Sequence, residues 1–225
     1  MKEYRKIPNI FKFDPDYKTV IGKTEVFEVL KNLEWIGTEK IDGTNIRVYW
    51  DGHDIQIAGR TDRAEIPKHL MEELNSLFLT EEMEYLFEQT FGDKEVYLFG
   101  EGYGPKIQAN GELYSNEPGF VLFDVTVNGY ELSLENVFDV GAKLGLKCVP
   151  LLFVGTLDRA IEYVAGHYYS HLGDNSEHEM EGLVLRTRYP LYDKDGHLIK
   201  CKCKYRDVIK LKGSVESNNK QRTKW

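Results

Sequence analysis

Residues 35–50 read Trp-Ile-Gly-Thr-Glu-Lys-Ile-Asp-Gly-Thr-Asn-Ile-Arg-Val-Tyr-Trp, and this stretch decides the fold. Apolar and β-branched residues on both sides of Asp42-Gly43 predict two short strands, over Trp35 to Lys40 and Thr44 to Trp50. The dipeptide Asp51-Gly52 then predicts a hairpin turn into a third strand. The stretch therefore predicts antiparallel strands with Lys40 at the junction, where its side chain can face a pocket.

The rest of the chain alternates between helical and strand periodicity. Helices are predicted over 26–33, 67–78, 81–91, about 133–144 and 157–165, and strands over 55–59, 96–103, 120–127, 146–154, 182–188 and 197–205. Strands dominate and several helices pack on them, so the fold class is α+β with mostly antiparallel sheets. We expect one domain over residues 1–205 and a short basic tail over 206–225, which is too short for an OB-fold.

Composition and charge exclude some classes of function. The chain has 225 residues, 41% of them apolar, and no uninterrupted apolar stretch of membrane-spanning length or secretory signal, which predicts a globular cytoplasmic protein with no membrane partner. A net charge of -8 argues against a passive nucleic-acid coat. From Lys194 to Trp225, however, ten Lys and Arg residues stand against three acidic ones, and such a segment can attract phosphates.

Lys40 is the first candidate catalytic residue. A lysine becomes a nucleophile only when its ammonium loses a proton, which burial or neighbouring cations favour. Taken alone, Lys-x-Asp-Gly is more often an exposed β-turn. Four further stretches follow it in order, namely Gly100-Glu101-Gly102, Phe120 to Asp124, Glu181-Gly182-Leu183-Val184 and Lys200-Cys201-Lys202.

With these five stretches in this order, the sequence resembles the covalent nucleotidyltransferases, which include ATP-dependent RNA and DNA ligases and messenger-RNA capping enzymes. Within that superfamily it is most similar to RNA ligases of the phage nick-sealing type. That similarity rests on Gly100 to Gln108, on the Gly-Thr-Asn ending of the lysine motif and on Gly59-Arg60-Thr61. The resemblance implies a nucleotidyltransferase (ATP-grasp-like) domain of two mostly antiparallel sheets with flanking helices and an ATP pocket between the sheets.

The activity that the resemblance implies is ATP-dependent RNA ligation, typical of RNA repair. Lys40 would attack the α-phosphorus of ATP to form lysyl-AMP, with Mg²⁺ or Mn²⁺ as the metal. AMP would pass to an RNA 5'-phosphate, and a 3'-hydroxyl would then seal RNA ends or a nick in duplex RNA. The alternatives are an ATP-dependent DNA ligase, a capping-type nucleotidyltransferase, or a nucleotide- or RNA-binding module without turnover. The natural RNA and the oligomeric state stay open.

The resemblance also implies roles for single residues. Lys200 and Lys202 contact the α-phosphate, and strand alternation puts both on one face with Lys204, which we interpret as a solvated edge lysine. Glu181 holds the metal and Glu101 binds the ribose. Phe120 stacks on adenine and leaves Phe123 in the core, because the two residues have opposite strand parity. The remaining roles are adenine recognition by Glu39, ribose or metal-bound water for Asn45, and substrate binding by Arg60.

Overall fold

The computed structural model describes residues 1–109, 111–173 and 178–211. The chain divides into two compact units, each with its own sheet and apolar core. Unit 1 comprises Met1–Arg5, Ile41–Val149 and Leu172–His178, and unit 2 comprises Lys6–Lys40, Pro150–His171 and Glu179–Trp225. All strand pairs in the three sheets are antiparallel, which confirms the predicted α+β class.

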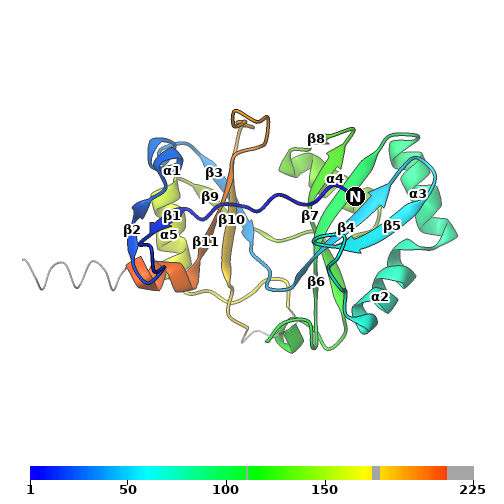
Figure 1. Ribbon diagram of the computed structural model, residues 1–225, viewed down its shortest axis with the longest axis horizontal. Coiled ribbons are helices and arrows are strands. Elements are labelled where there is room, and N and C mark those ends of the chain that lie inside the picture. Colours follow the sequence, from blue (N-terminus) through cyan, green and yellow to red (C-terminus); the bar gives the residue numbers. More distant parts are fainter. Residues whose placement is uncertain (110, 174–177, 212–225) are drawn as a thin grey trace, which may run out of the picture. The chain divides into compact units, whose positions relative to one another are not determined.

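Unit 1 is built on a five-stranded sheet whose spatial order begins with the hairpin predicted at Asp51-Gly52. In that order the strands are β5 (Ile55–Gly59), β4 (Thr44–Trp50), β6 (Val96–Tyr103), β7 (Gly119–Val127) and β8 (Tyr130–Glu131). A short 3₁₀ turn, η1 (Gly111–Leu113), lies in the connection between β6 and β7. Three helices pack on this sheet, α2 (Lys68–Phe78), α3 (Glu81–Phe91) and α4 (Leu134–Lys143) (Figure 1).

The helices of unit 1 form where the sequence supplies caps and one apolar face. The hydroxyl of Thr80 accepts the Met83 N–H at the start of α3, and Ser133 accepts the Asn136 N–H at the start of α4, as the sequence predicts for Ser133. The buried residues of the helices recur at helical spacing and meet alternate residues of the strands. This core includes Leu70, Leu74, Phe78, Met83, Phe87, Ile46, Val48, Leu98, Leu122 and Val125.

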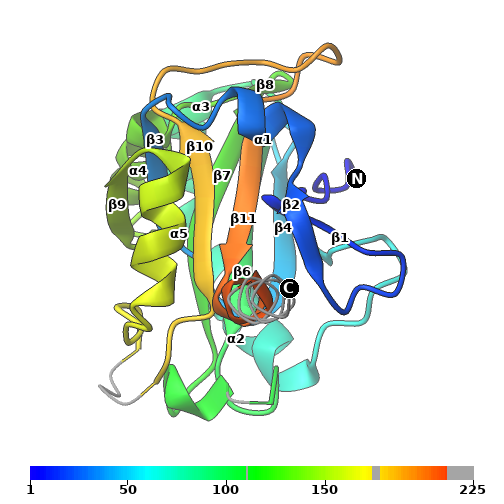
Figure 2. The ribbon, with the colours of Figure 1, turned by 90° about the vertical axis from the view of Figure 1, so that its left-hand side faces the viewer.

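Unit 2 is built on a four-stranded sheet in the order β11 (Lys200–Lys204), β10 (Gly182–Thr187), β3 (Trp35–Glu39) and β9 (Leu151–Gly155). Figure 2 shows β10 and β11 side by side. The unit also holds a hairpin of β1 (Phe11–Phe13) and β2 (Val20–Lys23), together with helices α1 (Glu25–Val29) and α5 (Leu157–Ala165). Residues 8–10 run along β11, because Lys202 N–H donates to the Pro8 carbonyl and Ile10 N–H donates to the Lys202 carbonyl.

Strand alternation divides the unit 2 sheet into an apolar face and a polar face. Trp35, Leu183, Leu185, Cys201 and Cys203 are buried in the core with α5. The cysteines are free, and burial raises the pKa of both thiols. The neighbouring residues in β3, β10 and β11 point to the other face, where the lysines of the candidate site lie.

Two sequence predictions about elements are wrong, and one element was missed. The strand predicted over 146–154 begins only at Leu151, because Leu146 N–H bonds back to the Gly141 carbonyl of α4 and residues 147–149 bond to Leu122 of β7. The helix predicted over 26–33 ends at Val29, and the β1–β2 hairpin was not predicted.

The described part of the basic tail, residues 206–211, is helical, and the rest of the tail predicted for 206–225 lies outside the described residues. Within the described ranges, no helix has the length and apolar character that a membrane span requires.

Candidate active site

Lys40 and Glu181 form the centre of the candidate site in unit 2. Lys40 follows β3, and its backbone N–H donates to the Gly182 carbonyl at 2.9 Å, which fixes the residue at the start of β10. Its Nζ lies 2.6 Å from Oε2 of Glu181. The other carboxylate oxygen, Oε1, lies 2.5 Å from Nζ of Lys204. One carboxylate therefore bridges two ammonium groups, and each of the three side chains is about four-fifths or more buried.

The register of β10 and β11 shows which lysines lie beside Lys40. Gly182 pairs with Lys204, Val184 with Lys202 and Arg186 with Lys200. Because Lys40 bonds to Gly182, Lys204 lies level with it and Lys202 lies one side-chain row further along the sheet. We call this side of the unit 2 sheet, with Lys40, Lys200, Lys202 and Lys204, the lysine face.

The register ranks the three lysines by their distance along the sheet from Lys40, and the ion pairs correct the interpretation of Lys204. Lys200 is two rows from Lys40, is buried and lies opposite Arg186, so the pair closest to the candidate nucleophile is Lys202 and Lys204 rather than Lys200 and Lys202. Lys204 is also not a solvated edge lysine, because it is 13% exposed and paired with Glu181. The sequence Lys200-Cys201-Lys202-Cys203-Lys204 contains two overlapping Lys-x-Lys pairs, and the sequence analysis considered only the first.

The charges of the lysine face perturb its own residues. Burial alone would raise the pKa of Glu181, but the attraction of Lys40 and the hydrogen bond from Lys204 outweigh it and hold that pKa below its ordinary value. Burial lowers the pKa of the Lys202 ammonium, and the like charges of Lys204, Lys40 and Lys6 lower it further. Excess positive charge on a half-buried surface is suited to a polyphosphate anion.

A second set of predicted residues lies together in unit 1, on the sheet face opposite the helices. Asn45 pairs across β4 and β6 with Glu101, and Glu101 pairs across β6 and β7 with Val121. The Oδ1 atom of Asn45 is buried and has no hydrogen-bond partner within the described ranges. A buried acceptor without a partner is costly, so this atom is available to a ligand that brings a donor.

The two phenylalanines of β7 point opposite to the prediction. Phe120 is 5% exposed in the helix-side core, where its ring meets that of Phe78 edge to face at 5.1 Å. Phe123 instead packs with Val121, on the face that carries Glu101. The prediction that Phe120 faces the pocket is therefore wrong.

The physical reason is the phase of β7 and a bulge within it. Phe120 and Leu122 must both face the helices to fill the core, which turns Val121 and Phe123 to the other side. In the ladder with β6, Phe99 pairs with Asp124 and Gly100 with Leu122, which places a bulge at Phe123.

Glu39 and Arg60 lie in different settings. Glu39 is 1% exposed on the apolar side of the unit 2 sheet, where its carboxylate accepts hydrogen bonds from the Ser170 hydroxyl and the His171 N–H. This structural role was missed by the sequence analysis. Arg60 is exposed and directly follows Gly59, which pairs with Ile46 next to Asn45.

The predicted metal would have to use few protein ligands. Within the described ranges, no group of three or more His, Cys, Asp or Glu side chains is placed to hold a metal ion. A lone carboxylate such as Glu181 still fits Mg²⁺, which in nucleotide sites takes one or two carboxylates and completes its shell with phosphate oxygens and water. The donor set therefore fits a metal that arrives with a nucleotide.

Comparison with solved structures shows the same fold in an RNA ligase from Naegleria gruberi. Naegleria gruberi RNA ligase with PPi matches with a TM-score of 0.64 and 18% identity over 98% of this chain and 58% of that chain. A mutant of that ligase with AMP and Mn matches with a TM-score of 0.65 and 18% identity, over 94% and 58% of the two chains. An apo mutant matches with a TM-score of 0.61 and 21% identity, over 84% and 54%.

The chain thus spans a little over half the length of these neighbours, and identities this low establish the fold alone. Comparison with curated protein sequences finds no match. The family model described as RNA ligase matches residues 33–212, which is most of the chain and holds Lys40, Glu101, Glu181 and Lys204. The chain therefore belongs to the RNA ligase family.

Proposed function

We propose that this RNA ligase family member is an ATP-dependent RNA ligase that carries AMP on Lys40. The observation that supports the proposal best is the carboxylate of Glu181 between the ammonium groups of Lys40 and Lys204. It brings a candidate nucleophile and a phosphate-neutralising cation to the two oxygens of one carboxylate, and that carboxylate is the predicted metal ligand.

In the first step, Nζ of Lys40 attacks the α-phosphorus of ATP, an N–P bond forms and the bond to pyrophosphate breaks. The proton on Nζ must leave before that bond forms, and the neighbouring cations of the lysine face favour its loss. Lys202 and Lys204 neutralise the phosphate oxygens as negative charge is redistributed toward pyrophosphate. We do not assign this role to Lys200, because the strand register places it two rows from Lys40.

Nucleoside binding is assigned to Asn45, Glu101 and Phe123, which lie on one face of the unit 1 sheet. Glu101 accepts a ribose hydroxyl, and the unsatisfied Oδ1 of Asn45 accepts a second donor from the ribose or from a metal-bound water. Phe123 replaces Phe120 as the ring that stacks on adenine. Arg60, exposed at the end of β5, is assigned to the polynucleotide phosphates.

A divalent metal completes this proposal. The neighbouring Naegleria structures include one with ATP and Mn and another with AMP and Mn. Bound beside the phosphates, Mg²⁺ or Mn²⁺ would withdraw charge from the reacting phosphate. Glu181 is the residue of this chain that would hold it, and Lys40 would then be released from its ion pair.

Two further steps complete the reaction. The AMP passes from Lys40 to an RNA 5'-phosphate, and a 3'-hydroxyl attacks the activated phosphate, forms the phosphodiester and releases AMP. The substrates are RNA ends or a nick in duplex RNA. Both steps are substitution at phosphorus, so the same cations serve each of them.

The test is transfer of label from α-labelled ATP to the protein in the presence of Mg²⁺ or Mn²⁺. Wild type should carry acid-stable label and Lys40→Ala should carry none. Lys68→Ala, which changes a 92%-exposed lysine in α2, serves as the matched control and should label like wild type. Absence of label on wild type with either metal would exclude the ligase mechanism and leave a binding module. Label from GTP instead of ATP would favour a capping-type enzyme.

Sealing is tested separately with nicked duplexes in which each strand is RNA or DNA. Joining of an RNA 3'-hydroxyl to an RNA 5'-phosphate supports the proposal. Joining restricted to DNA would instead identify a DNA ligase.

A further inference from the structure

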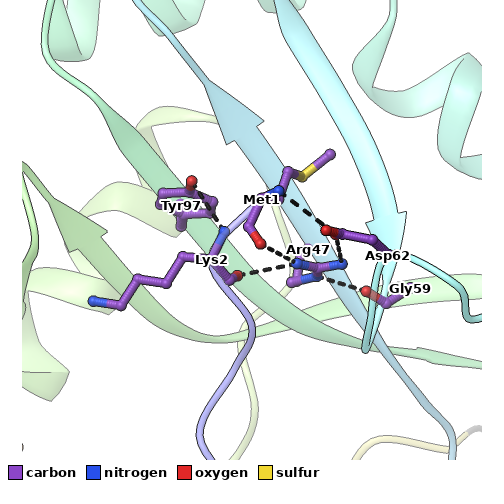
Figure 3. Close-up of polar contacts among 6 residues, drawn as sticks. All are labelled: Met1, Lys2, Arg47, Gly59, Asp62 and Tyr97. Atoms are coloured by element: carbon purple, nitrogen blue, oxygen red, sulfur yellow. Dashed lines mark hydrogen bonds and ion pairs between the residues drawn. The ribbon is translucent and has the colours of Figure 1, made fainter.

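Arg47 is a fully buried arginine that the sequence analysis did not single out. It lies on the same face of β4 as Asn45, two residues away, and its side chain is 0% exposed. Its Nε donates to the Gly59 carbonyl at 2.6 Å, and Nη2 lies 2.8 Å from Oδ1 of Asp62 (Figure 3). The hydrogen bond from Arg47 holds the pKa of Asp62 below its ordinary value.

The remaining donors of Arg47 bind the beginning of the chain. Nη1 donates to the carbonyl of Met1 at 2.9 Å and to that of Lys2 at 3.1 Å, as Figure 3 shows. Lys2 N–H in turn donates to the hydroxyl of Tyr97 at 3.2 Å. A buried guanidinium needs its donors satisfied, and here backbone carbonyls of residues 1 and 2 supply part of that set. We call Met1–Arg5, which belongs to unit 1, the N-terminal strap.

The strap carries Tyr4 to the bulge in β7. The Tyr4 hydroxyl donates to Asp124, and its ring lies 4.9 Å from Phe99 and 5.1 Å from Phe123 between centroids. Phe123 meets Tyr4 at an interplanar angle of 62°, the edge-on arrangement that aromatic pairs favour. One residue of the strap therefore contacts both consecutive side chains at the bulge.

Phe123 lies at the bulge, where the ladder to β6 passes from Leu122 to Asp124. A bulge redirects side chains out of the regular pleat, so the groups that pack on the Phe123 ring help to set its direction. Tyr4 supplies a wall on one side of the ring and holds the next residue through Asp124. Arg47 fixes the strap by a planar fork of donors, and a lysine has no such fork.

We propose that Tyr4 and Arg47 are positioning residues for the nucleotide, which orient Phe123 for stacking through the N-terminal strap. This inference rests on the proposed function, because it assumes that Phe123 stacks on the base. The strap is then part of the nucleotide site although it lies 35 residues before Lys40 in the chain. Neither residue touches the reacting atoms, so their loss should weaken nucleotide binding and leave the bond-forming step intact.

The experiment compares KM and kcat for lysyl-AMP formation in four variants. Tyr4→Ala should raise KM for ATP about three- to tenfold, the size of one lost aromatic contact, with kcat within about twofold of wild type. Tyr4→Phe keeps the ring and should recover most of the difference. Arg47→Lys should change KM in the same direction as Tyr4→Ala. Tyr130→Ala, at a 79%-exposed tyrosine of the same sheet, is the control and should match wild type.

Binding of labelled ATP by equilibrium dialysis gives a second readout that needs no turnover, and hydrogen exchange of residues 122–124 reports whether the bulge loosens. A fully active wild type with unchanged KM and ATP affinity in Tyr4→Ala would overturn the inference and leave the proposed function standing. A wild type that neither binds ATP nor takes label would overturn the proposed function, and this inference with it. If Arg47→Lys fails to fold, the comparison of Tyr4→Ala with Tyr4→Phe still tests whether the Tyr4 ring supports nucleotide binding.

Discussion

Lys204 lies with its Nζ 2.5 Å from Oε1 of Glu181, in the same ion pair that engages the candidate nucleophile. Lys200, two residues earlier on the same strand face, lies two rows away from Lys40. We therefore expect Lys204→Ala to reduce lysyl-AMP formation by about a hundredfold, as for loss of a cation that neutralises the reacting phosphate. Lys200→Met, which keeps most of the buried volume, should reduce it by less than about tenfold. Single-turnover labelling at saturating ATP measures both.

The informative result is which of the two variants loses more of the rate of lysyl-AMP formation. A larger loss in Lys200→Met than in Lys204→Ala would show that Lys200 and Lys202 act as the phosphate-binding pair, as the sequence motif alone indicates. Thermal unfolding of each variant must accompany the labelling, because Lys200 is buried and its replacement also affects packing.

Phe120 and Phe123 offer a matched test of which ring meets the nucleotide. Phe120→Ala should lower the free energy of unfolding by about 3–5 kcal/mol, because it empties a core position against Phe78. Phe123→Ala should be milder for stability and should raise KM for ATP, since the ring lies on the Glu101 face. Denaturant unfolding and ATP titration separate the two effects. A raised KM in Phe120→Ala together with an unchanged KM in Phe123→Ala would contradict the assignment.

Lys202 should make the ligand-free protein less stable than it would otherwise be. Burial and the charges of Lys204, Lys40 and Lys6 lower its pKa in the folded state below the ordinary 10.5. Between the two values the unfolded chain binds more protons, so the free energy of unfolding rises with pH there, and at neutral pH the folded state bears the full cost of the charge.

We therefore expect Lys202→Gln to raise the Tm of the ligand-free protein at pH 7 and to flatten the alkaline rise, while it slows lysyl-AMP formation. Pyrophosphate should raise the Tm of wild type more than that of the variant, because the anion relieves the repulsion. Lys68→Gln is the exposed control. A lower Tm in Lys202→Gln would show that Lys202 stabilises the free protein, contrary to this prediction.

Gly43 is required by close approach of the backbone. A Cβ atom at this position would lie 2.2 Å from the Gly102 carbonyl oxygen and 2.9 Å from Cγ of Glu101. The carbonyl belongs to β6, which pairs on both sides, so the strand cannot move away without breaking its ladders. Gly43→Ala should lower the free energy of unfolding by about 1–3 kcal/mol or more. An unchanged unfolding midpoint in denaturant would contradict the close packing.

Local signals in the sequence predicted most of the elements. The strands on either side of Asp42-Gly43, the helix over 81–91 and the hairpin at Asp51-Gly52 all depend on residues close together in the chain, and the structure has each of them. The turn at Asn128-Gly129 has both residues at positive φ, as a tight hairpin of this kind requires. The position of Lys200, Lys202 and Lys204 on one face of β11 also followed from period-two alternation alone.

The predictions that failed depended on strand register and on contacts between residues far apart in the sequence. Strand parity separates Phe120 from Phe123, but only the packing of Leu122 and Val125 on the helices fixes which of them is buried. The role of Lys204 required the pairing of β10 with β11, about twenty residues apart. Arg47 gave no signal at all, because its partners at residues 1 and 2 are some 45 positions away and are backbone carbonyls, which carry no side-chain signature.

The interleaving of the two units in the chain has a consequence for how the protein is made. Each unit is assembled from three separate stretches, and β3 receives its neighbours only from residues after 150. During synthesis β3 leaves the ribosome before its neighbours are made, so both of its edges are unpaired. Unpaired strand edges can associate with strands of other chains. Lys40 is likewise made more than 140 residues before Glu181. A chain that stops before Glu181 would therefore carry Lys40 without the carboxylate that engages it, and the ion pair of the candidate site can form only after Glu181 has been made.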